Sequence, residues 1–516
     1  FEELINVVPN LFWWGDGHRA RYLQIRGVGE LEQYQGAPNP SVGFLIDDID
    51  FSGIGTIATT FDVERIEVLR GPQGTRYGAN ALAGLVYVQS ASPTAEREGR
   101  VQLTAGGDDT LAGGIAFGGP LAGDESLLFR VSAHRHESNG FRDNAFLDRD
   151  DTNGREETTA RGRLRWHPAD TLSVDLAALY ADVDNGYDAF AIDNSLTMLS
   201  DKPGRDAQRS AGGSMRIEWS ALSWATLTSI TAAADSDIAF DFDADWGNGE
   251  SWAPVTYDFI SLSDRSRRSF SQEFRLASGD AGRIFGDTTD WLAGVYLLDL
   301  EDELLTVNRG EYFDPGFDFA DSLDDSFGSV YEAHNIAVFG QLDTGLGPAT
   351  RLSVGLRLER RTTDYADTAG LQAGPSETMT GGDVTLSHDH SEELTSFVSL
   401  SKGYKAGGFN LGIVPDDRRE FDAETLWNLE AGIKSMLLDG AVALNASVFY
   451  SRRDDQQVRT SFQLVPGDPA SFVFFTDNAA KGRTLGLEAE VRWAIGDRLD
   501  VYANVGLLDA EFEEFV

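Results

Sequence analysis

The sequence predicts a mainly β protein, in which a large antiparallel transmembrane β-barrel follows a small α+β domain. Three observations lead to this prediction. Apolar and polar residues alternate from about residue 98 to the end, the connections between these segments are alternately short and long, and the chain holds 55 glycines and 11% aromatic residues. Alternation with period two is typical of strands that have one apolar and one polar face.

The composition is compatible with such a barrel and excludes other classes. The chain has 516 residues, of which 41% are hydrophobic, and contains no apolar run long enough for a transmembrane helix. In a membrane barrel every second side chain faces a polar lumen, so the average sequence is hydrophilic. There is no cysteine, and the net charge is -42. We therefore expect no thiolate metal site, no cofactor and no nucleic-acid partner.

The alternation is clearest around residue 430. Here apolar side chains alternate with polar residues or glycine along a single segment. The apolar ones are Trp427, Leu429, Ala431 and Ile433, and the residues between them are Asn428, Glu430, Gly432 and Lys434. Because successive side chains of a strand point to opposite faces, we expect the first set to face lipid and Glu430 to face the lumen.

The lengths of the connections distinguish a membrane barrel from a soluble β protein. Short connections lie at 168–170, 438–440 and 496–498, and long ones at 138–155, 184–209, 238–264, 303–333 and 404–422. Outer-membrane barrels have short periplasmic turns and long external loops, whereas a soluble protein has no reason to sort its loops by length. A soluble propeller is the alternative, but no fixed repeat period is visible.

The number of strands gives a further expectation. Alternation indicates about 17 strands, whereas outer-membrane barrels with a filled lumen have 22. Single-chain bacterial barrels have even numbers of strands. We therefore expect the barrel to continue beyond Val516. Ladder hydrogen bonds between residues 100–106 and 501–509 would instead indicate a smaller closed barrel.

The first part of the chain has a different pattern. Residues 1–95 contain a glycine-rich stretch and short apolar runs at 42–46 and 65–69, and 90–94 has the composition of a boundary. We predict two domains, residues 1–95 and residues 96–516.

Several segments carry a family resemblance. The stretch FDVERIEVLRGPQGTRYGANALAG at 61–84 closely resembles the plug signature of TonB-dependent outer-membrane receptors. The segments 24–29 and 42–48 match the same plug, and 401–410 and 428–432 are similar to barrel strands of the family. The resemblance implies that residues 1–95 form a plug in the barrel lumen.

The resemblance also implies a function. It suggests an importer in the outer membrane of a Gram-negative bacterium, surrounded by outer-membrane lipid and energised by a TonB protein of the inner membrane. A ferric siderophore is the leading small-molecule ligand, while cobalamin, an oligosaccharide or another metal chelate stays open. No TonB box is recognisable, so the coupling rests on the resemblance alone.

Ligand contacts are expected at the outward-facing tips of the plug. These tips should lie at 12–19, 30–39, 53–59 and 76–80. Aromatic side chains beside hydrogen-bonding groups suit a ring-bearing ligand. The candidates are Trp14, His18, Arg19, Tyr34, Gln35, Tyr77 and Asn80. The alternative is that each of them packs a loop against the barrel.

The charged segment 64–70 indicates a polar contact between plug and barrel wall. Arg65 and Arg70 would face acidic side chains in the lumen, among which Glu273, Glu430 and Glu488 are the candidates. Water in the lumen could solvate these charges instead, and a plug that moves tolerates a wet interface.

Other functions are disfavoured. The acidic stretch at 241–246 resembles a calcium loop but has Trp246 where the turn needs glycine. Ser399 and Lys402 match a penicillin-binding motif by spacing only, so we expect no enzyme. A passive porin or a surface barrel would leave the plug signature unexplained, and the test is whether residues 1–95 fill the lumen.

Overall fold

The computed structural model describes residues 2–15, 19–30, 39–121, 125–410, 414–463, 472–496 and 498–515. Within these residues, no helix is long and apolar enough to cross a membrane.

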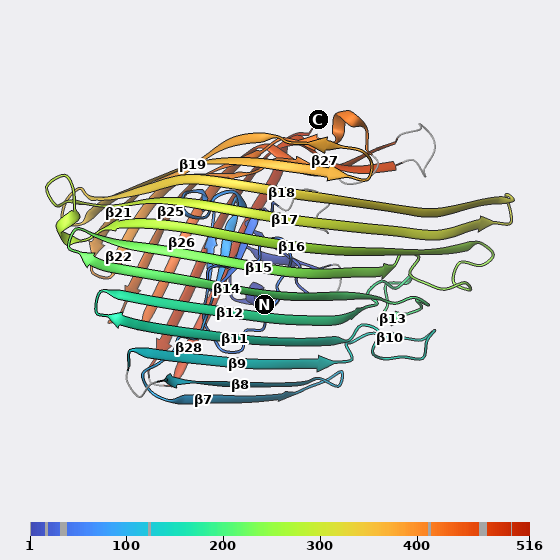
Figure 1. Cartoon of the computed structure of the whole chain (residues 1–516), viewed down its shortest axis with the longest axis horizontal. Helices are drawn as coiled ribbons and strands as arrows, with labels where there is room; N and C mark the ends of the chain where they lie inside the picture. Colours follow the sequence, from blue (N-terminus) through green and yellow to red (C-terminus); the bar gives the residue numbers. More distant parts are fainter. Residues whose placement is uncertain are drawn as a thin grey trace.

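Seventeen long strands form the wall, in agreement with the expected number (Figure 1). They are β7 (Glu98–Ala105), β8 (Leu111–Pro120), β9 (Leu127–Ser138), β11 (Arg155–Ala169), β12 (Leu172–Tyr187), β14 (Gly204–Leu222), β15 (Ala225–Asp243), β16 (Thr256–Ser278), β17 (Thr289–Asp314), β18 (Phe319–Gly345), β19 (Thr350–Asp367), β21 (Ser376–Ser391), β22 (Leu394–Lys405), β25 (Glu424–Leu437), β26 (Val442–Gln463), β27 (Phe472–Ile495) and β28 (Leu499–Phe515). The two-residue strand β20 (Gln372–Ala373) pairs antiparallel with the end of β19. Each long strand pairs antiparallel with the next.

The junction between the first and last strands differs from the others. In the strand order β28 is followed by β7, which closes the barrel. Because the number of long strands is odd, these two run in the same direction. In the described residues, no residue of β28 is matched to a particular residue of β7 in a strand ladder. The residues of β7 are exposed on both faces of the strand. The expectation of further strands beyond Val516 therefore stays a prediction.

The long connections are shorter than predicted, and one prediction is wrong. Residues 303–333 are not a loop, because β17 and β18 stay paired until Asp314 lies opposite Phe319. This hairpin extends past its neighbours at the right of Figure 1. Outside the membrane both faces of a strand can be polar, so a ladder continues where apolar alternation ends. For the same reason, the connections predicted at 184–209 and 238–264 shrink to 188–203 and 244–255.

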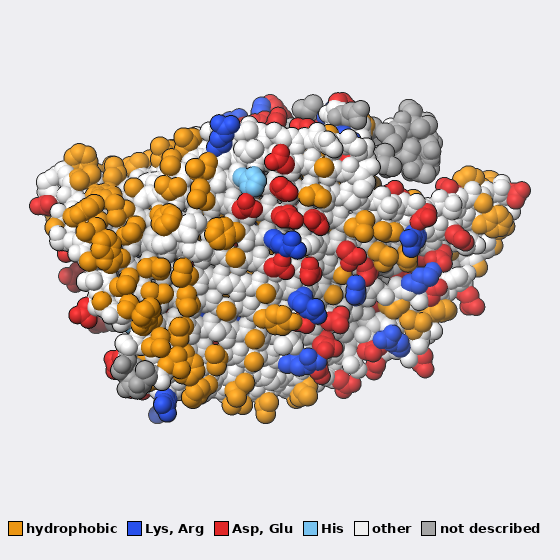
Figure 2. Space-filling view, in the orientation of Figure 1, with side chains coloured by type: hydrophobic (Ala, Val, Ile, Leu, Met, Phe, Trp, Pro, Cys, Tyr) orange, Lys and Arg blue, Asp and Glu red, His pale blue; other side chains and the backbone are white. Residues whose placement is uncertain are grey.

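On the face shown in Figure 2, an apolar band covers the half of the wall that carries the short turns. The outward side chains of β25, on another part of the wall, are exposed in the same way. Trp427, Leu429 and Ile433 are 44%, 50% and 38% exposed, whereas Asn428 is only 3% exposed. Glu430 accepts a hydrogen bond from Arg26 inside the barrel. The predicted faces of this strand are therefore confirmed. On the face in Figure 2, the other half of the wall carries most of the charged side chains, among further apolar ones.

The N-terminal domain is a small α+β unit inside the wall. Its sheet has the order β4-β3-β6-β5, from β3 (Val42–Ile46), β4 (Ile49–Asp50), β5 (Val63–Arg70) and β6 (Gly84–Ser90). Two further strands, β1 (Leu11–Trp14) and β2 (Tyr22–Ile25), and the short helix α1 (Gly74–Tyr77) complete it. Its apolar core includes Ile46, Phe51 and Val88 and packs against Leu179 and Leu426 of the wall.

A plug in the lumen is therefore confirmed. Its sheet ends at Ser90 and the wall begins at Glu98, so the predicted boundary at residue 95 falls in the connection. Small elements lie outside the two main sheets: η1 (Glu2–Asn6), η2 (Gly78–Asn80), β10 (Asp143–Asn144), β13 (Thr197–Met198), η3 (Asp280–Gly282), β23 (Gly408–Phe409), η4 (Asp416–Arg418) and β24 (Glu420–Phe421).

Candidate functional site

A set of ion pairs fastens the plug to the wall on the side of β25 and β27. Arg26 directly follows β2 and adopts a positive φ of 55°, which directs its side chain out of the plug. Its Nη1 lies 2.8 Å from Glu430 and its Nη2 lies 2.8 Å from Glu488. Arg70, the last residue of β5, reaches Glu488 at 3.3 Å and Glu490 at 2.8 Å. We call Arg26, Arg70, Glu430 and Glu488 the ionic set.

The centre of the ionic set is dry. Arg26 is 4% exposed and Glu488 is 2% exposed. The amide of Asn10 donates a further hydrogen bond to Glu488 at 3.1 Å, and the guanidinium of Arg26 lies 3.9 Å from the ring centre of Phe449. Burial by itself would lower the pKa of Arg26, but hydrogen bonds and charge from Glu488 and Glu430 raise it. Buried charges are stable only when paired in this way.

The rim of the ionic set is more exposed than its centre. A cavity of about 450 Å³ lies beside it, between β5 of the plug and the wall strands β21 to β27. Arg70 and Glu490, both lining this cavity, are 22% and 34% exposed. The plug is thus held here by ion pairs at the edge of a cavity, in addition to its apolar contacts with the wall.

Two of the predicted wall contacts are corrected. Arg65 is 58% exposed, pairs with Glu67 of its own strand and bonds Gln89 of β6. It does not reach the wall because it lies an odd number of residues from Arg70, so the two side chains leave opposite faces of β5. Glu273 is buried on the lumen side but pairs with Arg275 of its own strand.

These placements lead to a matched pair of expected results. Changing Arg70 to alanine should reduce the protection of β5 from amide hydrogen exchange by about 1–2 kcal/mol, because charged hydrogen bonds to the wall are lost. Changing Arg65 to alanine should alter the same protection by less than about 0.5 kcal/mol, as for an ordinary surface residue. Equal losses in both variants would contradict this assignment.

A second group of contacts fastens the outer side of the plug. Arg19 and Arg21 lie 2.7 Å and 2.8 Å from Asp206 of β14. Glu30 lies 2.9 Å from Lys405 of β22. Burial alone would raise the pKa of Glu30, but Lys405 and hydrogen bonds from Ser41 lower it. The alternation of residues along β14 is enough to predict that Asp206 faces the lumen. That it pairs with Arg19 and Arg21 depends on the tertiary fold.

The predicted ligand residues lie at different depths. Trp14 ends β1 and is 48% exposed, whereas Arg19 is buried in its ion pair. Tyr77 and Asn80 line a cavity of about 60 Å³ together with Glu273 and Arg357. The amide of Asn80 donates to Asp50 at 3.4 Å. The other candidates, His18, Tyr34 and Gln35, lie outside the described residues.

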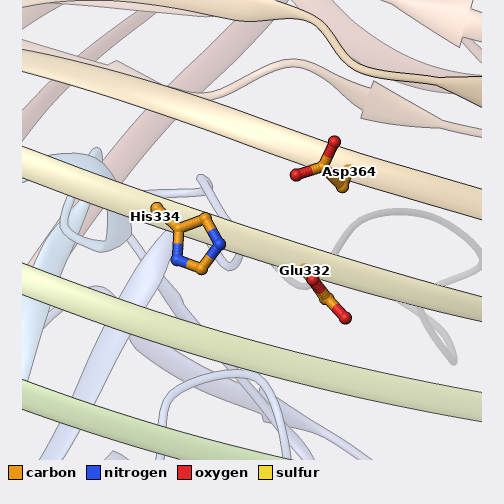
Figure 3. A group of neighbouring side chains, drawn as sticks. All are labelled: Glu332, His334 and Asp364. Atoms are coloured by element: carbon orange, nitrogen blue, oxygen red, sulfur yellow. The ribbon is translucent and has the colours of Figure 1, made fainter.

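One group of side chains on the outer surface has the residue types of a metal site. Glu332, His334 and Asp364 lie on the neighbouring strands β18 and β19, with their ligand atoms within 4.8 Å of one another (Figure 3). All three are exposed, and His334 Nδ1 lies 3.1 Å from Asp299. The group faces away from the plug and takes no part in the lumen site.

A wall with an outward apolar band and a charged plug in its lumen defines a plugged outer-membrane transporter. The family comparisons agree with this class. Residues 91–514 match the model described as "TonB dependent receptor-like, beta-barrel", and residues 1–85 match the "TonB-dependent Receptor Plug Domain". The chain belongs to the TonB-dependent receptor family, whose members are outer-membrane transporters of Gram-negative bacteria and not enzymes.

Individual relatives cover most of the chain at low identity. The pesticin receptor of Yersinia enterocolitica is 24% identical over 521 residues, which covers 98% of this chain and 72% of the relative. The crystal structure of the ferric yersiniabactin uptake receptor from Yersinia pestis has a TM-score of 0.81 at 20% identity and covers 99% of this chain and 76% of that one. The siderophore receptor PiuA from Acinetobacter baumannii has a TM-score of 0.73 at 15% identity, with 98% and 76% covered. At these identities the structures show the fold alone.

Proposed function

We propose that this chain imports a ferric siderophore across the outer membrane. The observation that supports import most directly is the ionic set, which holds a plug inside the barrel by paired charges beside a cavity of about 450 Å³. A passive porin would need an open lumen. The siderophore is favoured because similar structures include a ferric yersiniabactin uptake receptor and a siderophore receptor.

The physical role of the ionic set is to make the plug both tight and movable. A buried ion pair adds little to the free energy of the folded plug while both partners stay together. One charge left in the buried centre without its partner raises that free energy by several kcal/mol. The adjacent cavity offers water to charges that separate at the rim. In the proposed cycle, force from a TonB protein separates the pairs, the cargo passes, and the pairs reform.

Trp14, with His18 and Tyr34, is proposed to contact the cargo at the outer tips of the plug. Simultaneous replacement of all three by alanine should weaken ligand binding about ten-fold or more while folding is unchanged, because a buried aromatic anchor contributes about 2 kcal/mol or more. The measurement is the dissociation constant of the purified receptor for its co-purified cargo. Unchanged affinity would remove the three residues from the site.

The cargo itself is tested in two steps. The receptor is purified from native membranes grown with little iron, and bound small molecules and metals are identified by mass spectrometry. A strain that lacks its own siderophore receptors and carries this chain is then given ⁵⁵Fe-yersiniabactin and the identified compound. Uptake that requires both the chain and TonB supports the proposal. Recovery of cobalamin, an oligosaccharide or another metal chelate, without iron uptake, contradicts the siderophore assignment.

A further inference from the structure

The outer wall brings a histidine and two carboxylates together on neighbouring strands (Figure 3). Glu332 and His334 are two residues apart on β18, so both leave its outer face, and Asp364 lies directly opposite Glu332 on β19. Their ligand atoms lie within 4.8 Å of one another. Ligands at about 2.0–2.2 Å from a tetrahedral Zn²⁺ ion lie about 3.4 Å apart. Because all three side chains are exposed, small rotations can bring them to that spacing.

The ring of His334 is held in the way that metal-binding histidines are held. Its Nδ1 lies 3.1 Å from a carboxylate oxygen of Asp299, which is directly opposite on β17. A histidine that binds a metal through one ring nitrogen usually donates the N–H of the other to a carboxylate, which fixes its tautomer and orientation. When Nδ1–H donates to Asp299, Nε2 presents its lone pair. Figure 3 shows a ring nitrogen turned toward Glu332 and Asp364.

The two carboxylates face each other without a bridging cation from the protein. Like charges directly opposite in a sheet destabilise it, and in the described part of the chain neither Glu332 nor Asp364 forms an ion pair with lysine or arginine. Glu137 and Glu156 form the same kind of facing pair between β9 and β11. There Arg135 bridges them, at 2.5 Å from each.

His334 occupies the place of that arginine, two residues along its strand from one of the facing carboxylates. A histidine carries a charge only when it is protonated, whereas a metal ion bound to its nitrogen keeps its charge. One imidazole and two carboxylates suit Zn²⁺ and similar divalent transition metals, while Ca²⁺ and Mg²⁺ prefer oxygen ligands alone. Three protein ligands leave a fourth position, open to the outside, for water.

The group lies where the wall leaves its apolar surface. Ile336 and Val338, the next outward side chains of β18, are both 52% exposed, and in the other direction the pairing of β18 with β19 ends at Ser329. Beyond that point only the hairpin of β17 and β18 continues. An ion held here would join β18 to β19 at the base of this hairpin.

We propose that Glu332, His334 and Asp364 form a Zn²⁺-binding site on the outer wall, with Asp299 as the residue that positions the histidine. The bound ion neutralises the two facing carboxylates and restrains the base of the β17–β18 hairpin. The site lies on the outside of the barrel and is independent of the proposed import function.

The first test is calorimetric titration of the full chain in detergent with ZnCl₂, after removal of metals with EDTA. The wild type should bind one more Zn²⁺ ion than His334→Ala. Glu332→Gln and Asp364→Asn should each weaken that binding about ten-fold or more, and Asp299→Asn, which keeps all three ligands, should weaken it about ten-fold. The control is His388→Ala, which removes another exposed histidine, near the end of β21, and should keep the site.

The second test locates the ion by amide hydrogen exchange. Zn²⁺ should slow exchange at 329–336 and 360–367 in the wild type and in His388→Ala, but not in His334→Ala. All the variants change exposed side chains, so their unfolding midpoints without metal should not fall below that of the wild type. The proposal is overturned if His334→Ala binds Zn²⁺ as the wild type does, if the protection appears elsewhere, or if CaCl₂ or MgCl₂ at the same concentration protects these strands equally.

Discussion

Replacing Glu488 with alanine should loosen the plug more than any other single change in the ionic set. Glu488 is 2% exposed and is shared by Arg26 and Arg70. Its loss leaves Arg26 in the dry centre with Glu430 alone, and breaking a buried pair from one side costs about 3–5 kcal/mol. We expect faster amide hydrogen exchange in residues 22–30 and 63–70, and greater entry of a large hydrophilic antibiotic into cells.

Two variants make this expectation specific. Glu490→Ala removes a carboxylate that is 34% exposed and pairs with Arg70 alone, so its cost should stay below about 1 kcal/mol. A variant that replaces both Arg26 and Glu488 by methionine should recover part of the loss, because it removes the two most buried charges of the ionic set together. Glu430, which loses Arg26, is 15% exposed. Equal exchange rates in Glu488→Ala and Glu490→Ala would show that the plug is held elsewhere.

Placing arginine at Leu429 should destabilise the barrel by about 2–4 kcal/mol, as expected for a charge on the lipid face near the midplane. Leu429 is 50% exposed on the outside of β25, between Leu400 and Tyr450 on the neighbouring strands. All three side chains are exposed on the outer face of the wall. The measurement is the free energy of unfolding of the chain refolded into lipid vesicles.

The matched control lies on the same hairpin. Leu438 is 67% exposed in the turn after β25, where water and headgroups can solvate a charge, so Leu438→Arg should change the free energy by less than about 1 kcal/mol. If both variants unfold at the same denaturant concentration, the outer face of β25 does not contact the hydrocarbon core.

Much of the wall was predictable because it depends on local regularity. The alternation from Trp427 to Lys434 determines which side chains face outward, since a shift by one residue would reverse every side chain. It does not determine how far two paired strands continue outside the membrane, where both faces can be polar. For this reason β17 and β18 were predicted too short. The same rule, applied to β5, would have shown that Arg65 and Arg70 point to opposite faces.

The candidate site was only partly predictable. Glu430 and Glu488 were predicted as lumen acids because they alternate with apolar residues, and the structure pairs both with Arg26. Arg26 itself was missed as a wall contact, although its position after a short strand and before glycine was visible.

The sequence by itself determined the class of fold, the inward and outward faces of the strands and the presence of a plug, because each depends on neighbours along the chain. Only the tertiary structure decided which plug arginine meets which wall carboxylate and how far the external hairpins extend. These depend on strands hundreds of residues apart, such as β2 and β27, which only the closure of the barrel around the plug brings together.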